Sequence, residues 1–250
     1  MGRVVDCDEF CQICLALERC GAENINLVTA SHHVPRVAEY LRCAKRRGLA
    51  LPIVWNTSSY ETPETLTALL GIVDVWLADL KSLSKSVSLS LFLAADYPSV
   101  AKSAILWMAD HSPLVLCDVK RGDEVAQKVL SGVIVRHLAL PGLMRDTLEA
   151  IVWIKENLGE RVALSLMSQY CPPKGAAHKG CGELWRTLNA RERQVLDDVA
   201  QAADFALVYK QEAGCEDEQV LPDFSRRSPF PPELAATVWH WREGFVAPHR

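Results

Sequence analysis

The chain has no long apolar run and no excess of positive charge. Its 250 residues carry 27 Lys and Arg against 31 Asp and Glu, which gives a formal net charge of −4. This balance does not provide the basic surface that nucleic-acid binding requires. Apolar stretches such as residues 72–80 have the length of strands and are interrupted by acidic residues, so no membrane-spanning helix is expected. The N-terminus carries Asp6, Asp8 and Glu9 besides Arg3, unlike a signal peptide, and we expect a cytoplasmic protein.

A disulfide framework is also not expected. The nine cysteines are an odd number and are scattered through segments with the pattern of helices and strands. Without a secretion signal, free thiols in a reducing compartment are the default expectation.

Short β-branched runs alternate with amphipathic segments, and this order predicts an α/β domain with a parallel sheet. The expected strands are residues 24–29, 51–60, 73–81, 132–142, 161–170 and 205–210. The expected helices are residues 8–20, 35–47, 63–70, 97–110, 146–158 and 190–203. One domain over residues 1–224 suits this length. Residues 225–250 read as a Pro- and Arg-rich C-terminal tail.

Polar residues gather where the expected strands end. In a parallel barrel these ends meet at one face, so a shared pocket is predicted there. The alternative is that they are ordinary loop and capping residues. The five groups are Thr29-Ala30-Ser31-His32, Asn56-Thr57-Ser58, Asp79 with Lys81, Arg136-His137, and Ser168-Gln169.

The order of several unusual segments resembles a known family. They are GAENINLVTASHHVP, LPIVWNTSSYE, VDVWLADLK, DYPSVAKSAI, GVIVRHLALPG, SLMSQYCP and LPDF. In this order they are similar to radical SAM proteins of the pyruvate formate-lyase activating enzyme type, over residues 2–224. The resemblance implies a partial (β/α)6 TIM-like barrel, here with the family's first strand missing. It also implies two cofactors, a [4Fe-4S] cluster and S-adenosylmethionine.

The same resemblance implies the site residues. Asn56, Thr57 and Ser58 stand where the family lines the cofactor pocket, and Ser31, with Thr29 and Ala30, stands where related enzymes have a Gly-Gly-Glu-like strand end. Asp79 and Lys81 stand near the methionine end of the cofactor, and Arg136 stands at a cofactor contact. These side chains would position the cofactor, and no catalytic side chain is predicted. The alternative for Asp79 and Lys81 is a simple surface pair, since residues two apart on a strand share a face.

Cys7, Cys11 and Cys14 have the C-x3-C-x2-C spacing with which radical SAM enzymes hold their cluster. In the resemblance, however, this stretch matches the helix that follows the cluster loop. The spacing i, i+4, i+7 also suits the apolar face of a helix, in which cysteine acts as a small hydrophobe. We therefore expect no cluster ligands here. Three accounts remain: a truncated reading frame, a degenerate protein, or a helix that unwinds to bind a cluster.

The resemblance implies that a complete form cleaves S-adenosylmethionine reductively at the [4Fe-4S] cluster. The resulting radical abstracts hydrogen, as in the activation of a glycyl radical enzyme, so a protein substrate is an expected partner. One alternative is a non-catalytic scaffold or interaction protein of the same fold. Another is a different barrel enzyme that uses His32, Asp79 and Lys81 directly. A zinc site at Cys171, His178 and Cys181, with Cys215 as a possible fourth ligand, is a further alternative.

Overall fold

The computed structural model describes residues 2–122, 124–172, 182–210, 228 and 236–246. Its centre is a seven-stranded sheet in the order β1-β2-β3-β5-β6-β7, and β4 pairs with β5 outside this path. All pairs along the path are parallel, whereas β4 and β5 are antiparallel. The strands are β1 Ile25–Val28, β2 Ile53–Thr57, β3 Val75–Asp79, β4 Val115–Arg121, β5 Glu124–Leu138, β6 Val162–Met167 and β7 Val208–Lys210.

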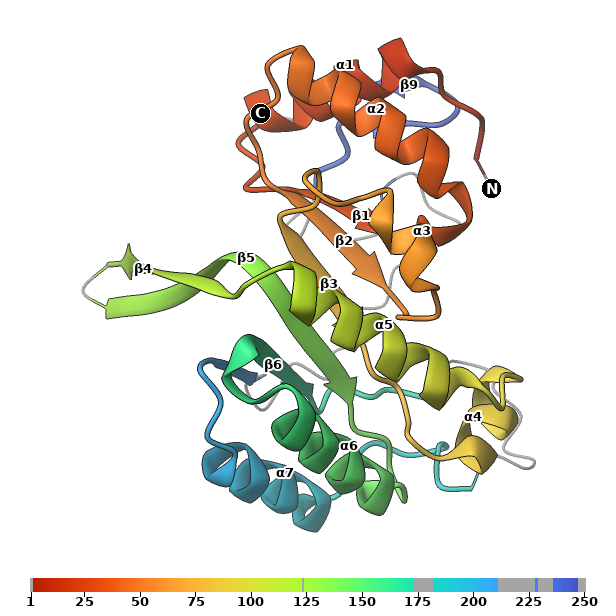
Figure 1. Cartoon of the computed structure of the whole chain (residues 1–250), viewed down its shortest axis with the longest axis vertical. Coiled ribbons are helices and arrows are strands. Elements are labelled where there is room, and N and C mark those ends of the chain that lie inside the picture. Colours follow the sequence, from red (N-terminus) through yellow and green to blue (C-terminus); the bar gives the residue numbers. More distant parts are fainter. Residues whose placement is uncertain (1, 123, 173–181, 211–227, 229–235, 247–250) are drawn as a thin grey trace.

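Along the chain, helices alternate with the parallel strands, as expected for successive βα units (Figure 1). Helices α1 and α2 lie at the β1 end of the sheet, and α6 and α7 lie at the β6 end (Figure 1). Within the described residues, no helix is both long and apolar enough to cross a membrane. The helices are α1 Cys7–Arg19, α2 Val34–Arg46, α3 Pro63–Thr67, α4 Lys85–Phe92, α5 Tyr97–His111, α6 Met144–Asn157 and α7 Ala190–Ala202.

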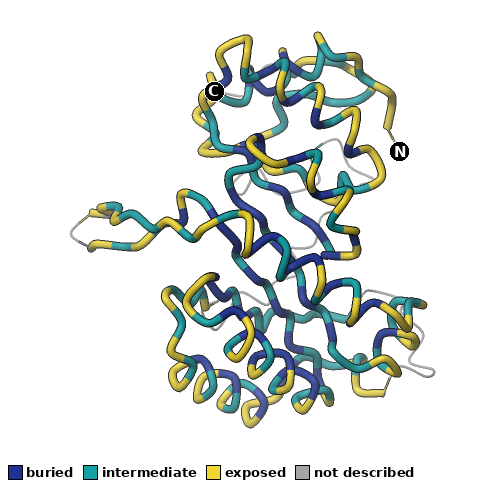
Figure 2. The backbone as a smooth tube through the Cα atoms, viewed as in Figure 1, coloured by how far each residue is buried: buried dark blue, intermediate teal, exposed yellow. Residues whose placement is uncertain are grey.

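The two faces of the sheet have different environments. In β2 every second side chain is buried, and Trp55 is fully enclosed together with Trp76 of β3. Successive side chains of a strand point to opposite faces, so Val54 and Asn56 lie on the other, less covered face. The strands run as a buried band through the middle of the molecule (Figure 2). The helix-covered face is therefore the main core, and the opposite face is available for a site.

A β-hairpin arm was not predicted from the sequence. Strand β5 begins eight residues before the expected start at Gly132 and pairs with β4 to form an arm that projects from the sheet (Figure 1). At Gly132, φ is +114°, and a Cβ would lie 2.7 Å from the Cα of Leu114. Only glycine fits this close approach, where the chain passes from the arm into the main sheet.

Two short strands near the C-terminus, β8 Trp239–His240 and β9 Gly244–Phe245, pack against the start of the chain. The indole N–H of Trp239 donates to the Glu9 carboxylate at 3.1 Å, and the Arg3 guanidinium lies 5.0 Å from the centre of the Trp239 ring. The predicted boundary after residue 224 lies outside the described residues.

The carboxylate of Glu192 ties helix α7 to the loop that follows β5. This carboxylate accepts hydrogen bonds from the backbone N–H groups of Gly142 and Asn189, both at 2.8 Å. The two carboxylate oxygens also accept hydrogen bonds from the two terminal nitrogens of Arg186, at 2.6 and 2.9 Å. The Arg186 hydrogen bonds, followed by these backbone donors, lower the pKa of Glu192 to about 2.

Because this pKa lies below the value of about 4.3 in an unfolded chain, Glu192 stabilises the fold above that pH. The contribution is lost as the pH falls toward 2. We expect Glu192→Gln to lower the free energy of unfolding at neutral pH by on the order of 1 kcal/mol. The difference in free energy of unfolding between this variant and the unmodified chain should disappear in acid. Urea unfolding at several pH values measures it. Glu149→Gln, at a half-exposed position on α6, is the control. A difference in free energy of unfolding that does not change with pH would contradict this account.

Candidate functional site

Three polar side chains meet where neighbouring strands end. Asn56 comes from β2, Asp79 from β3 and Arg136 from β5. The Arg136 Nε–H donates to Oδ1 of Asp79 at 2.8 Å, and Nη2 donates to Oδ1 of Asn56 at 2.7 Å. Asp79 and Arg136 are direct neighbours in the parallel register. One arginine thus joins the ends of three strands.

Lys81 completes this group, which we call the strand-end cluster: Asn56, Asp79, Lys81 and Arg136. The Lys81 ammonium donates to Oδ2 of Asp79 at 2.9 Å. Both oxygens of the carboxylate are therefore held by cations. The Asp79 side chain is 17% exposed, and those of Arg136 and Lys81 are 22% and 37% exposed. With two cations and one carboxylate, the cluster has a formal charge of +1 and is open enough to reach an anionic ligand.

The alternation of side chains explains why these residues lie on one face. Asn56, Asp79 and Arg136 each lie two positions beyond an apolar residue of the same strand: Val54, Leu77 and Ile134. Those three residues line a cavity of about 550 Å³ toward the starts of the strands. The less covered face thus has a hollow with both apolar and charged lining and, beyond it along the strands, the strand-end cluster.

Tyr97, at the first position of α5, fixes the loops beside the cluster. Its hydroxyl oxygen accepts a hydrogen bond from the backbone N–H of Lys81 at 3.0 Å. It also lies 2.9 Å from the carbonyl oxygens of Ser58 and Asp79. Burial raises the pKa of this phenol. Sequence reasoning missed this positioning role, although Tyr97 lies in the segment DYPSVAKSAI that contributed to the resemblance.

Other residues predicted for the site lie elsewhere. Thr57 is buried on the helix-covered face, where its hydroxyl donates to Glu61. Ser58 contributes its backbone carbonyl to Tyr97. Ser31 begins a short 3-10 turn after β1, and the hydrogen bonds of the described residues do not join it to the strand-end cluster.

The two predicted histidines are also separate from the cluster. His137 is buried on the helix-covered face, between the carbonyl of Leu80 and the hydroxyl of Thr147. Burial lowers its pKa and favours the neutral ring. His32 packs against the ring of His33, at a centroid distance of 4.4 Å. Within the described part of the chain, His32 forms no hydrogen bond or ion pair with Asp79 or Lys81.

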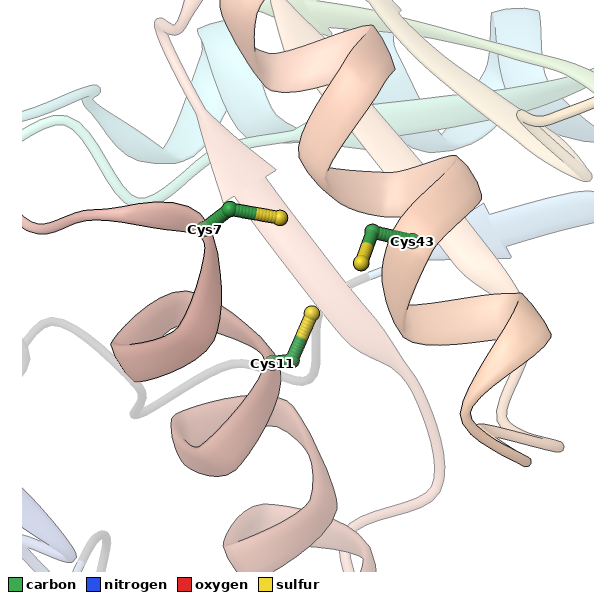
Figure 3. A group of neighbouring side chains, drawn as sticks. All are labelled: Cys7, Cys11 and Cys43. Atoms are coloured by element: carbon green, nitrogen blue, oxygen red, sulfur yellow. The ribbon is translucent and has the colours of Figure 1, made fainter.

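The C-x3-C-x2-C cysteines lie in one continuous helix, α1. Cys14 is 2% exposed, and burial raises its pKa to about 11. Cys7 and Cys11 instead group with Cys43 of α2, and their three sulfur atoms lie within 4.8 Å of one another (Figure 3). Of the alternative zinc site, Cys171 is half-buried, whereas His178, Cys181 and Cys215 lie outside the described residues.

Solved structures with a similar fold include a domain of pyruvate-formate lyase-activating enzyme from Bacteroides vulgatus. It has a TM-score of 0.53 and 12% sequence identity, with 76% of this chain and 99% of that domain covered. Streptococcus suis SuiB has a TM-score of 0.56 and 9% identity, covering 94% of this chain and 50% of SuiB. The structure of SuiB bound to S-adenosylmethionine has a TM-score of 0.54 and 9% sequence identity, covering 89% of this chain and 47% of SuiB.

In sequence, the chain is 26% identical over 189 residues to an uncharacterized protein of Methanocaldococcus jannaschii. The match covers 75% of this chain and 49% of that protein, so the chain spans about half the length of this curated relative. No model of a known protein family matches the chain. The structural likenesses confirm the predicted fold class, a mostly parallel α/β sheet arranged as a partial TIM-like barrel, which these solved structures share.

Proposed function

We propose that this chain is a radical SAM-like protein that binds S-adenosylmethionine through the strand-end cluster. The observation that carries the proposal is the convergence of Asn56, Asp79 and Arg136 on one face, at the ends of three adjacent parallel strands. Such strand ends are where barrels of this kind bind their ligands. A structural neighbour bound to S-adenosylmethionine supports the choice of ligand.

The cluster has complementary groups for the methionine end of this molecule. That end is a zwitterion, with a carboxylate and an ammonium group. The Nη1 nitrogen of Arg136 has no protein partner in the described structure, and the Lys81 ammonium uses one of its three N–H groups on Asp79. These free donors suit the ligand carboxylate. The oxygens of Asp79 and Asn56 suit the ligand ammonium.

The residues of α1 do not fit a [4Fe-4S] cluster. Such a cluster needs three thiolates around one cube, whereas Cys14 is buried in a continuous helix and lies outside the group that Cys7 and Cys11 form. We therefore assign no step of the reaction to these cysteines. Reductive cleavage of S-adenosylmethionine, with hydrogen abstraction from a partner such as a glycyl radical enzyme, is proposed only for a form in which other ligands hold the cluster.

The helical course of α1 favours a second candidate function, which is ligand binding by a non-catalytic protein of the same fold. The two candidates differ in one product. After anaerobic reconstitution with iron and sulfide and chemical reduction, only the radical function releases 5′-deoxyadenosine from S-adenosylmethionine.

Binding is tested by calorimetric titration with S-adenosylmethionine and with methylthioadenosine, which lacks the amino-acid end. We expect the complete ligand to bind more tightly. We also expect Arg136→Leu to weaken its binding by about tenfold to a hundredfold, as the loss of a charge-assisted hydrogen bond requires. Methylthioadenosine should bind both proteins equally.

Arg145→Leu, which changes an exposed arginine of α6, is the matched control. The proposal fails if the complete ligand binds no better than methylthioadenosine. It also fails if Arg136→Leu binds the complete ligand as tightly as the unmodified chain does.

A further inference from the structure

A group of three cysteines lies between the first two helices, away from the strand-end cluster. Cys7 and Cys11 are one helical turn apart on α1, and Cys43 faces them from α2. Their sulfur atoms lie within 4.8 Å of one another and point toward one another in the space between the helices (Figure 3). A pair of thiols would suffice for a disulfide bond, whereas three convergent thiols form most of a metal coordination sphere.

The helix packing fixes this arrangement. Residues four apart share one face of a helix, so α1 presents Cys7 and Cys11 together to α2. Contacts on both sides of the cysteines hold the two helices in register. The rings of Phe10 and Tyr40 lie 5.7 Å apart, and Arg47 forms an ion pair with Asp8. The thiol of Cys11 also lies 3.9 Å from the Tyr40 carbonyl oxygen.

The spacing is close to what a soft metal ion requires. Bonds of about 2.3 Å from sulfur to zinc place tetrahedral sulfur ligands about 3.8 Å apart. The sulfur atoms lie at most 4.8 Å apart in this structure. Side-chain shifts of about 1 Å or less would therefore bring them to the distances of a zinc site. The backbone of the two helices does not have to change.

The cysteine group has positive charge beside it and one open side. Arg46 and Arg47, at the end of α2, place positive charge near Cys43 and offset the charge of thiolates. Cys11 is fully buried, whereas Cys7 and Cys43 are partly exposed. A bound ion would thus be held from inside by Cys11 and would keep a position for water or an external thiol on its outer side.

We propose that Cys7, Cys11 and Cys43 form a binding site for one soft, thiol-preferring metal ion, with Zn²⁺ or Cu⁺ as the fitting class. Thiolate ligands select such ions over Mg²⁺, Ca²⁺ or Mn²⁺. The site is independent of the proposed binding of S-adenosylmethionine. It joins α1 to α2, so the ion stabilises the packing of these two helices.

The test uses the full chain, reduced and freed of metal. We expect one equivalent of Co²⁺ to give thiolate-to-metal charge-transfer absorption, and Zn²⁺ to displace it in competition with a chromophoric chelator. Loss of an outer-shell partner of a metal costs about 10–100-fold in affinity. The loss of a ligand itself should cost at least as much. We therefore expect Cys7→Ser and Cys43→Ser, both at partly exposed positions, each to weaken Zn²⁺ binding by at least about tenfold. Circular dichroism establishes that the variants remain folded.

Two controls separate this site from the other cysteines. Cys14→Ala changes the same helix outside the group, and Cys171→Ser changes the loop of the alternative zinc site. Both should bind Zn²⁺ as the unmodified chain does. The proposal is overturned if Cys7→Ser and Cys43→Ser retain full affinity, or if Cys171→Ser loses it. It is also overturned if the reduced chain binds no metal and oxidation merely links Cys43 to α1, or if the bound metal is a multi-iron cluster that requires Cys14.

Discussion

Replacing Asp79 with alanine is expected to abolish measurable binding of S-adenosylmethionine and to lower stability. The carboxylate of Asp79 holds both Arg136 and Lys81 at the strand ends. Its removal leaves two neighbouring cations without their shared anion, and the loss of hydrogen bonds to a partly buried charged group costs about 1.5–3 kcal/mol. The ligand also loses the group assigned to its ammonium. Chemical denaturation and calorimetric titration measure the two effects.

Two companion variants keep this result interpretable. Asp79→Asn preserves the shape and should fold better than Asp79→Ala, while still losing most of the affinity for the ligand. Asp110→Ala removes an exposed carboxylate that pairs with Arg161, and should change stability by less than about 1 kcal/mol. Binding of S-adenosylmethionine to Asp79→Asn with unchanged affinity would show that the ligand does not use this carboxylate.

Replacing Trp55 with alanine is expected to give the largest loss of stability. Trp55 is fully buried on the helix-covered face of β2, and its indole N–H donates to the buried Glu61 carboxylate at 3.2 Å. Truncation of such a side chain to alanine costs about 3–5 kcal/mol through the cavity that it leaves. In a chain of this size we expect the melting temperature to fall by roughly 6–20 °C.

Trp185→Ala is the matched control, because Trp185 is 57% exposed. Its effect should stay within about 0.5 kcal/mol. If Trp55→Ala costs less than Trp185→Ala, the assignment of the two sheet faces is wrong.

The strongly patterned elements could be predicted from the sequence, and the weakly patterned ones could not. Helix α2 begins and ends within one residue of the expected range, because its apolar stripe and the glycine after it define both limits. Helix α4 was missed because its serine-rich sequence carries little helical periodicity; its N-terminus is set by the Ser84 side chain, which accepts from the N–H of Val87. The β4–β5 arm was missed because its side chains are largely exposed, as at Val125 and Leu130.

The candidate site was predictable only in part, for a geometric reason. Consecutive strand residues were grouped in the sequence, although consecutive side chains point to opposite faces. Applying that alternation to the sequence would already have separated Thr57 from Asn56, and His137 from Arg136. The meeting of Cys43 with Cys7 and Cys11 could not be read in this way, since it depends on how two helices pack against each other.

The central claim is that the strand-end cluster holds the methionine end of S-adenosylmethionine. A crystal structure of the chain with this ligand tests it most directly. The account predicts the ligand carboxylate within hydrogen-bonding distance of Arg136 or Lys81, and the ammonium against Asp79 and Asn56. A ligand bound elsewhere on the chain, with the cluster still paired only with itself, would contradict it.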